Sequence, residues 1–227
     1  QTYEVILVVA GREERASIKA VIDLFDPKEG YPEIVFMPLN FSISDYASVL
    51  RRLENKTVAL LAVSIMEESL ELRCAYSVAK HFVTSQANKA KISPEICVIY
   101  SERSRTIKED AFENEYTKIE VSHRTDPSYL ANTDPVIFIL KLMGADVEAY
   151  IRGFYDCVSA PEWDTNLPLI ASRMIEFENK GIIVESWQKE YEEFAKWFAR
   201  PDIRASHRQI QMPSLSLDNE CLRICIG

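Results

Sequence analysis

The sequence is short of glycine, with six in 227 residues, and it lacks the glycine-rich phosphate loops. After the apolar run Val5–Val9, the segment Gly11–Arg15 holds one glycine, where a dinucleotide-binding turn has three. The patterns G-x-G-x-x-G and G-x-x-x-x-G-K-[ST] do not occur, which disfavours ordinary dinucleotide and P-loop chemistry. A G-x-S-x-G elbow is also missing, which counts against an α/β-hydrolase. We therefore expect no cofactor.

Positive charge and long apolar runs are scarce as well. The chain has 26 Lys and Arg against 35 Asp and Glu, a net charge of −9. Nucleic-acid binding needs cations that neutralise phosphates, so this balance disfavours that class of protein. No apolar run approaches the roughly 18–20 residues that cross a bilayer, so no membrane span is expected.

The cysteines do not form a recognisable framework. An odd number at irregular spacing is unlike a secreted disulfide scaffold, which favours an intracellular over a secreted protein. Cys221-x-x-x-Cys225 lacks a second ligand pair, so no metal site is predicted. The sequons at Asn40 and Asn55 keep a secreted alternative open. The five cysteines are Cys74, Cys97, Cys157, Cys221 and Cys225.

Through the first hundred residues, unbroken apolar runs alternate with segments whose apolar residues recur at helical spacing. Near-continuous apolar runs are typical of strands covered on both faces, as in parallel sheets. The pattern predicts an α/β fold: a Rossmann-like or flavodoxin-like three-layer arrangement with a mostly parallel sheet and a helical C-terminal part. The expected strands are Val5–Val9, Ile34–Met37, Val58–Val63 and Ile96–Tyr100. The expected helices are Ala16–Phe25, one capped by Ser44, and one from about Glu67 to Val83.

The second half departs from this rhythm. The polar stretch over 101–132 is expected to be a long loop that leaves the sheet, an edge strand around Ile119–Val121, or a flexible flap. Val136–Leu140 is expected to be another buried strand. Leu167–Phe177 is expected to be helical, Ile182–Val184 a short strand, and Ser186 the cap of a final helix. We expect one α/β domain over 1–200, with a sub-boundary near 101–133, and an irregular tail over 201–227.

The strand–helix order over Tyr3–Tyr100 resembles the first lobe of type I periplasmic-binding-like domains. It is also similar to flavodoxin-like and other Rossmann-like domains. The resemblance covers less than half of the chain and rests on pattern. It implies the fold and transfers neither a ligand nor a residue role.

Ligands of open parallel sheets bind beyond the carboxyl ends of the strands. Several residues that follow the predicted strands are cationic, and a helix begins near Gly11. Such cations and a helix N-terminus together could bind a carboxylate or phosphate group. The alternative is that these are ordinary polar loops, in which Glu13 and Glu14 partly cancel the arginines. The candidate ligand-binding residues are Gly11, Arg12, Arg15, Asn40, Ser42, Ser64, Ser101, Arg103 and Lys141.

The final predicted helix is rich in large aromatic side chains. They are too many for one narrow stripe, and aromatic residues are enriched at interfaces, so some are candidates for contact with a protein partner or a second copy of the chain. The alternative is that all of them close the core of a helical layer. These residues are Trp187, Tyr191, Phe194, Trp197 and Phe198.

Three functions remain open from the sequence. The first is a non-enzymatic α/β binding or assembly domain that recognises a protein partner or a small ligand. The second is an enzyme that acts on a small phosphate- or carboxylate-bearing substrate in the strand-end crevice. The third is an extracellular ligand-binding receptor lobe, which would use the two sequons.

Overall fold

The computed structural model describes residues 3–122, 124–159, 182–186, 188–198, 210–211 and 222–226. Contacts divide the chain into two compact units. Unit 1 comprises Gln1–Ile18 and Asp26–Ala145, and unit 2 comprises Lys19–Phe25 and Asp146–Gly227. Because this grouping concerns compactness and not independent folding, the single domain expected over 1–200 stays a prediction.

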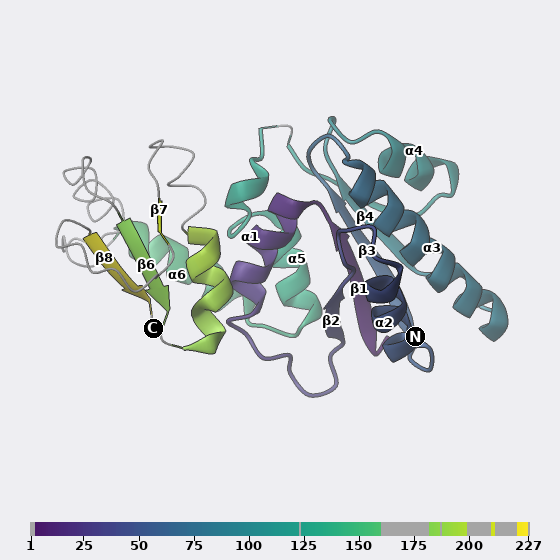
Figure 1. Ribbon diagram of the computed structural model, residues 1–227, viewed down its shortest axis with the longest axis horizontal. Helices are drawn as coiled ribbons and strands as arrows, with labels where there is room; N and C mark the ends of the chain where they lie inside the picture. The colour runs from purple at the N-terminus through teal and green to yellow at the C-terminus, as the bar shows by residue number, and fades with distance from the viewer. Residues whose placement is uncertain are drawn as a thin grey trace. The chain divides into compact units, whose positions relative to one another are not determined.

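Unit 1 is built on a five-stranded sheet in which every neighbouring pair is parallel (Figure 1). The strand order is β2-β1-β3-β4-β5. This is the flavodoxin-like order, whose topological switch point lies between β1 and β3. The predicted parallel α/β sheet is confirmed. The strands are β1 (Val5–Ala10), β2 (Glu33–Phe36), β3 (Val58–Ser64), β4 (Ile96–Tyr100) and β5 (Thr117–Glu120).

Helices cover both faces of this sheet (Figure 1). One face carries α2 (Ile43–Leu53), α3 (Leu70–Ala90) and α4 (Thr106–Glu113). The other face carries the start of α1 (Arg12–Ile22) and α5 (Asp134–Leu142), with a short 3-10 turn, η1 (Pro127–Tyr129), before α5. None of the helices in the described part of the chain is long and apolar enough to cross a membrane.

The two central strands are buried along their whole length. Every side chain of β1 and β3 is buried. They pair in parallel from Val5 opposite Val58 to Ala10 opposite Val63. Strands covered on both faces need apolar side chains at every position, which is why both read as unbroken apolar runs in the sequence.

The strand predicted over Val136–Leu140 is wrong, because these residues lie in α5. Val136, Ile139 and Leu140 are buried and Ile137 is half-buried, so burial follows helical spacing and not that of a strand. A short apolar run fits a buried strand and a buried helix equally well, and here the tertiary packing decided the outcome.

The structure also decides between the alternatives for one segment and moves the start of two predicted helices. Within the polar stretch 101–132, the edge-strand alternative is correct, because β5 pairs with β4. The cap of α2 is Ser42 and not Ser44: the Ser42 hydroxyl accepts a hydrogen bond from the Asp45 amide (3.3 Å). Ser69 caps α3, which starts at Leu70, so the preceding glutamates lie in the loop after β3.

Unit 2 contains helix α6 (Val147–Ser159) and a small parallel sheet in the order β7-β6-β8. The predicted short strand is confirmed as β6 (Ile182–Ser186). The predicted cap is wrong, because Ser186 ends β6 and the helix occupies 192–198, after a 3-10 turn η2 (Lys189–Tyr191).

The tail expected to be irregular contains β7 (Ile210–Gln211) and β8 (Leu222–Ile226), since both pair with β6. Strands that pair with residues far away in the sequence are hard to predict from the neighbouring residues alone. The helix predicted over Leu167–Phe177 lies outside the described residues.

The burial of β3 generates a first prediction. Leu60→Ala should lower the free energy of unfolding by about 2–5 kcal/mol, because it leaves a cavity in a core where Leu60 is 1% exposed. Ile43→Ala, at a position that is 83% exposed, should change it by less than about 0.5 kcal/mol. Urea unfolding of the two variants beside the unmodified protein measures both. Equal losses would contradict the buried position of β3.

Candidate functional site

The carboxyl ends of β1 and β3 meet at one edge of the sheet, because Ala10 pairs with Val63. Gly11 and Ser64 therefore lie at the topological switch point, where open α/β sheets bind ligands. A hollow of about 270 Å³ opens beside them. Its lining residues are Gly11, Arg12, Glu13, Glu14, Leu39, Met66, Glu67, Ser69, Glu71 and Leu72.

This hollow is acidic. Four glutamates line it against a single guanidinium, that of Arg12. The pKa of Glu71 is lowered by its own backbone N–H, by the Ser69 hydroxyl and by the charge of Arg12. Within the described residues, no group of three or more His, Cys, Asp or Glu side chains is placed to hold a metal ion. The hollow thus disfavours a phosphate or carboxylate ligand, contrary to the expectation of a cationic rim.

Glu14 is the most buried charged side chain of the hollow, at 3% exposed. Its Oε1 accepts hydrogen bonds from the backbone N–H groups of Ile65 and Met66, each at 3.3 Å. Burial raises the pKa of Glu14 above its ordinary value of 4.5, although these hydrogen bonds act in the opposite direction. The carboxyl group therefore occupies the backbone donors that follow β3.

Gly11 makes room for this carboxyl group. A Cβ atom at position 11 would lie 2.3 Å from Glu14 Oε2, closer than real contacts allow. The glycine after β1 thus serves the close approach of a side chain from the same protein.

A second carboxylate, Glu68, occupies the N-terminus of α4. Its oxygens accept hydrogen bonds from the Ser104 hydroxyl (2.8 Å) and from the backbone N–H groups of Arg105, Thr106 and Ile107 (each 3.0 Å). The cap residue of α4, Arg105, makes no side-chain cap of its own. Burial alone would raise the pKa of Glu68. The hydrogen bonds to its carboxylate outweigh burial, so the pKa is lowered. Their donors, from the largest effect to the smallest, are Ile107, Ser104, Thr106 and Arg105.

Ser64, Ser101 and Arg103 lie at the carboxyl ends of β3 and β4, where they contact other parts of the protein. Ser64 and Ser101 are both fully buried. The Ser101 hydroxyl donates to the backbone oxygen of Ile65 (2.5 Å), and the Ser64 hydroxyl donates to Glu68 (3.4 Å). Arg103 Nη1 lies 3.2 Å from the sulfur of Met66. These residues hold neighbouring loops together.

The other candidates are not brought to the hollow. Arg15 donates to the backbone oxygen of Met37 (3.0 Å). The Asn40 amide donates to Asp45 (2.8 Å), at the start of α2. Lys141 was expected to follow a strand, but it lies in the last turn of α5, because that segment is helical. Of the nine candidates, the structure places Gly11 and Arg12 in the lining of the hollow.

Sequence reasoning missed the two glutamates that organise this edge. Glu14 was treated as a charge that cancels the arginines, and Glu68 was placed inside a helix. The usable signal is the pair Glu67-Glu68, which closely follows a buried strand ending at Ser64. Carboxylates at that point lie where a sheet of this type presents its backbone donors.

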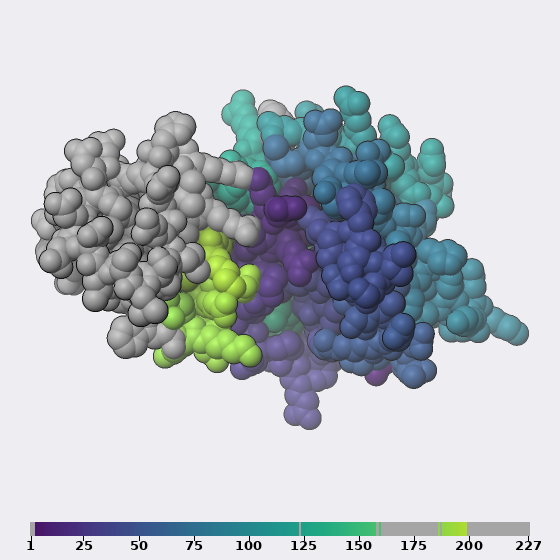
Figure 2. Space-filling view, viewed as in Figure 1, coloured from purple at the N-terminus to yellow at the C-terminus, as the bar shows by residue number. Residues whose placement is uncertain are grey.

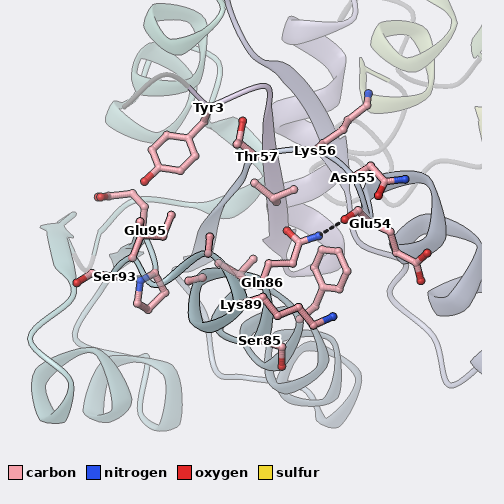
Figure 3. A pocket seen from close by; sticks show the side chains of 17 residues that line it. Tyr3, Glu54, Asn55, Lys56, Thr57, Ser85, Gln86, Lys89, Ser93 and Glu95 are labelled. Atoms are coloured by element: carbon pink, nitrogen blue, oxygen red, sulfur yellow. Dashed lines mark hydrogen bonds between the residues drawn. The ribbon is translucent and has the colours of Figure 1, made fainter.

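A larger hollow, of about 740 Å³, lies at the amino ends of β3 and β4 (Figure 3). Gln86 projects from α3 and donates to the backbone oxygens of Leu53 (3.0 Å) and Glu54 (3.1 Å), which satisfies the end of α2. Tyr3 and Glu95 lie across the hollow from Gln86 (Figure 3). Burial and the charge of Glu95 raise the pKa of Tyr3. The hydrogen bonds of Gln86 thus join α3 to the end of α2.

The aromatic residues of the last helix pack partly on one another. The ring of Phe194 lies 5.4 Å from that of Trp197 and 6.4 Å from that of Phe198. Tyr191, Trp197 and Phe198 are half-buried, and Trp187 lies outside the described residues. Their role as an interface stays a prediction.

The capping role of Glu68 generates a second prediction. Glu68→Ala should lower the free energy of unfolding by about 1–2 kcal/mol at neutral pH, because it removes the cap of α4. Since the folded pKa of Glu68 is lowered, its contribution is complete above the unfolded pKa and is lost as the pH falls through the folded pKa. Urea unfolding at several pH values measures this. The control is Glu113→Ala, exposed in the last turn of α4; equal effects would contradict the capping role.

Glu14 generates a third prediction, in which the pH dependence of stability is opposite to that expected for Glu68. Glu14→Gln keeps an oxygen acceptor for Ile65 N–H and removes the cost of burying a charge. Because the folded pKa is raised, the carboxyl group favours folding most below its unfolded pKa, and this advantage is lost as the pH rises through the folded pKa. The stability of the variant relative to the unmodified protein should therefore increase with pH from 4.5 upward. A pH-independent difference in urea unfolding would contradict the raised pKa.

Comparison with known proteins supports the fold. No protein-family model and no curated protein sequence matches the chain. A crystal structure of a hypothetical protein from Thermus thermophilus is similar, with 12% identity and a TM-score of 0.75, over 99% of this chain and 54% of that one. A glucose-6-phosphate isomerase from Chlamydia trachomatis is similar too, with 13% identity and a TM-score of 0.68, over 99% of this chain and 45% of that one. The chain spans about half the length of each, and at such identities the likeness shows the three-layer α/β fold alone.

Proposed function

We propose that this protein is a non-enzymatic α/β binding domain that recognises a protein partner. The observation that carries the proposal is the position of Glu14 and Glu68 at the carboxyl edge of the sheet. Their carboxylates bind the backbone N–H groups that a substrate anion uses in folds of this type.

A phosphate-bearing substrate meets two obstacles at this edge. It has to displace Glu68 from the four donors at the start of α4, where the hydrogen bonds are 2.8–3.0 Å long. It also has to approach Glu13, Glu67 and Glu71, whose negative charge repels it. The isomerase activity named for the Chlamydia protein belongs to that protein, since one fold supports many functions.

A protein partner fits the surface better than a small anion. Several large apolar side chains are exposed, among them Phe41 (57%), Ile43 (83%) and Leu70 (56%). Contiguous exposed apolar surface is typical of sites that bind another protein, a membrane or a ligand. Recognition of a protein needs no glycine loop and no activated nucleophile.

A fourth prediction tests this function. Inorganic phosphate and glucose 6-phosphate, titrated separately into the isotope-labelled full chain, should leave the amide signals of Gly11–Glu14 and Arg105–Ile107 unchanged, with any Kd weaker than about 1 mM. The protein should not isomerise glucose 6-phosphate. Glu68→Ala should gain phosphate-induced shifts at Arg105–Ile107, because it frees these donors, whereas Glu113→Ala should not.

Saturable phosphate binding by the unmodified protein at either segment, or isomerase activity, would overturn the proposal. A Glu68→Ala protein that is folded and still insensitive to phosphate would show that this carboxylate is not what excludes the anion.

A further inference from the structure

We infer that the carboxyl edge of unit 1 docks a segment of a protein partner that carries a basic side chain flanked by apolar ones. This inference rests on the proposed binding function and names the chemistry of the partner. It joins three observations on the described residues: the shape of the hollow at the switch point, its charge, and the exposed apolar side chains around it.

The hollow has the size and lining for a single long basic side chain. At about 270 Å³ it is smaller than the roughly 300–1,000 Å³ of pockets that bind drug-sized ligands. Leu39 and Leu72 supply apolar wall, and Glu67 and Glu71 supply carboxylates. Lysine and arginine bury an aliphatic stem against apolar surface and keep the charged head near water or a counter-ion, which matches this lining.

Exposed apolar side chains lie close in sequence to residues that line the hollow. Leu70 stands between two lining residues, Ser69 and Glu71, at the first position of α3. Phe41 follows the lining residue Leu39 by two positions, and Ile43 opens α2.

The helices α2 and α3 share one face of the sheet, and both begin at its carboxyl edge. Figure 2 shows the blue atoms of α2 as a continuous surface on the viewed face. Phe41, Ile43 and Leu70 are exposed where these two helices begin, and there we place the apolar contacts of the partner.

Charge decides which partner this surface takes. The hollow carries four glutamates and one arginine on a chain of net charge −9, so nucleic acids, anionic membranes and acidic peptides are repelled. A purely apolar segment would desolvate the Glu67 carboxylate without giving it a counter-ion, which costs free energy, whereas Glu71 already lies near the charge of Arg12. A basic amphipathic segment pairs the carboxylates and covers Ile43 and Leu70 at the same time.

A fifth prediction follows, with a defined probe. The probe is a short synthetic peptide with arginine flanked by leucines, and its matched control has glutamate in place of arginine. Titrated into the isotope-labelled full chain, the arginine peptide should shift the amide signals of Gly11–Glu14 and Met66–Leu72, with an affinity that falls as NaCl is added. The glutamate peptide should leave these signals unchanged.

Two double variants separate the contributions of charge and apolar surface. Glu67→Gln with Glu71→Gln, and Ile43→Ser with Leu70→Ser, should each weaken binding of the arginine peptide about tenfold. Glu109→Gln with Glu113→Gln removes the same charge from α4 and should leave binding unchanged. Ile43 and Leu70 are exposed, so these variants should fold, and their amide spectra verify this.

The outcomes distinguish the docking inference from the proposed function. Failure of the arginine peptide to bind, equal binding of both peptides, or equal weakening by the Glu109/Glu113 control would overturn the docking inference. Each of these results leaves the phosphate titration, and with it the non-enzymatic function, unaffected. Phosphate binding or isomerase activity would overturn the proposed function whatever the peptides do.

Discussion

The parallel pairing of β1 with β3 is the interaction on which the rest of the structure depends. Both strands are buried on both faces, and their register places Ala10 opposite Val63. A slip by one residue would exchange the side chains that face α2 and α3 with those that face α1 and α5, so packing fixes the register. The loops after the two strands consequently start at one level, which brings the Glu14 carboxyl group within reach of the backbone after β3.

The backbone hydrogen-bond donors at this edge are then bound by side chains of the protein itself. In related architectures the loops after the central strands and the helix N-termini present free backbone donors to a ligand. Here Glu14 takes the donors of one loop, and Glu68 takes those at the start of α4. Glu68 thereby caps α4, while Glu13, Glu67 and Glu71 add negative charge to the hollow. These contacts are the basis of our proposal that the edge meets a basic protein partner and does not bind a small anion.

Much of the fold was predictable from the sequence, because buried parallel strands need unbroken apolar runs. All four strands expected in the first hundred residues are present, with boundaries shifted by at most one residue. The error over Val136–Leu140 arose because a short apolar run has no periodicity that separates a buried strand from a buried helix. The candidate site was predicted less well. The binding role predicted for this edge stays a prediction. Its charge was expected to come from arginines, whereas four glutamates line the hollow. Lys141 was predicted to follow a strand, but that segment is helical.

The sequence by itself determined the apolar strands, their alternation with helices and the lack of a glycine-rich phosphate loop, because each is a property of neighbouring residues. Only the tertiary structure decided where the carboxylates go. Glu14 reaches a backbone amide 51 residues away, and Glu68 reaches one 39 residues away. Such partners are set by strand register and helix packing, and no local pattern specifies them. The acidic lining of the hollow at this edge is for that reason a property of the folded protein.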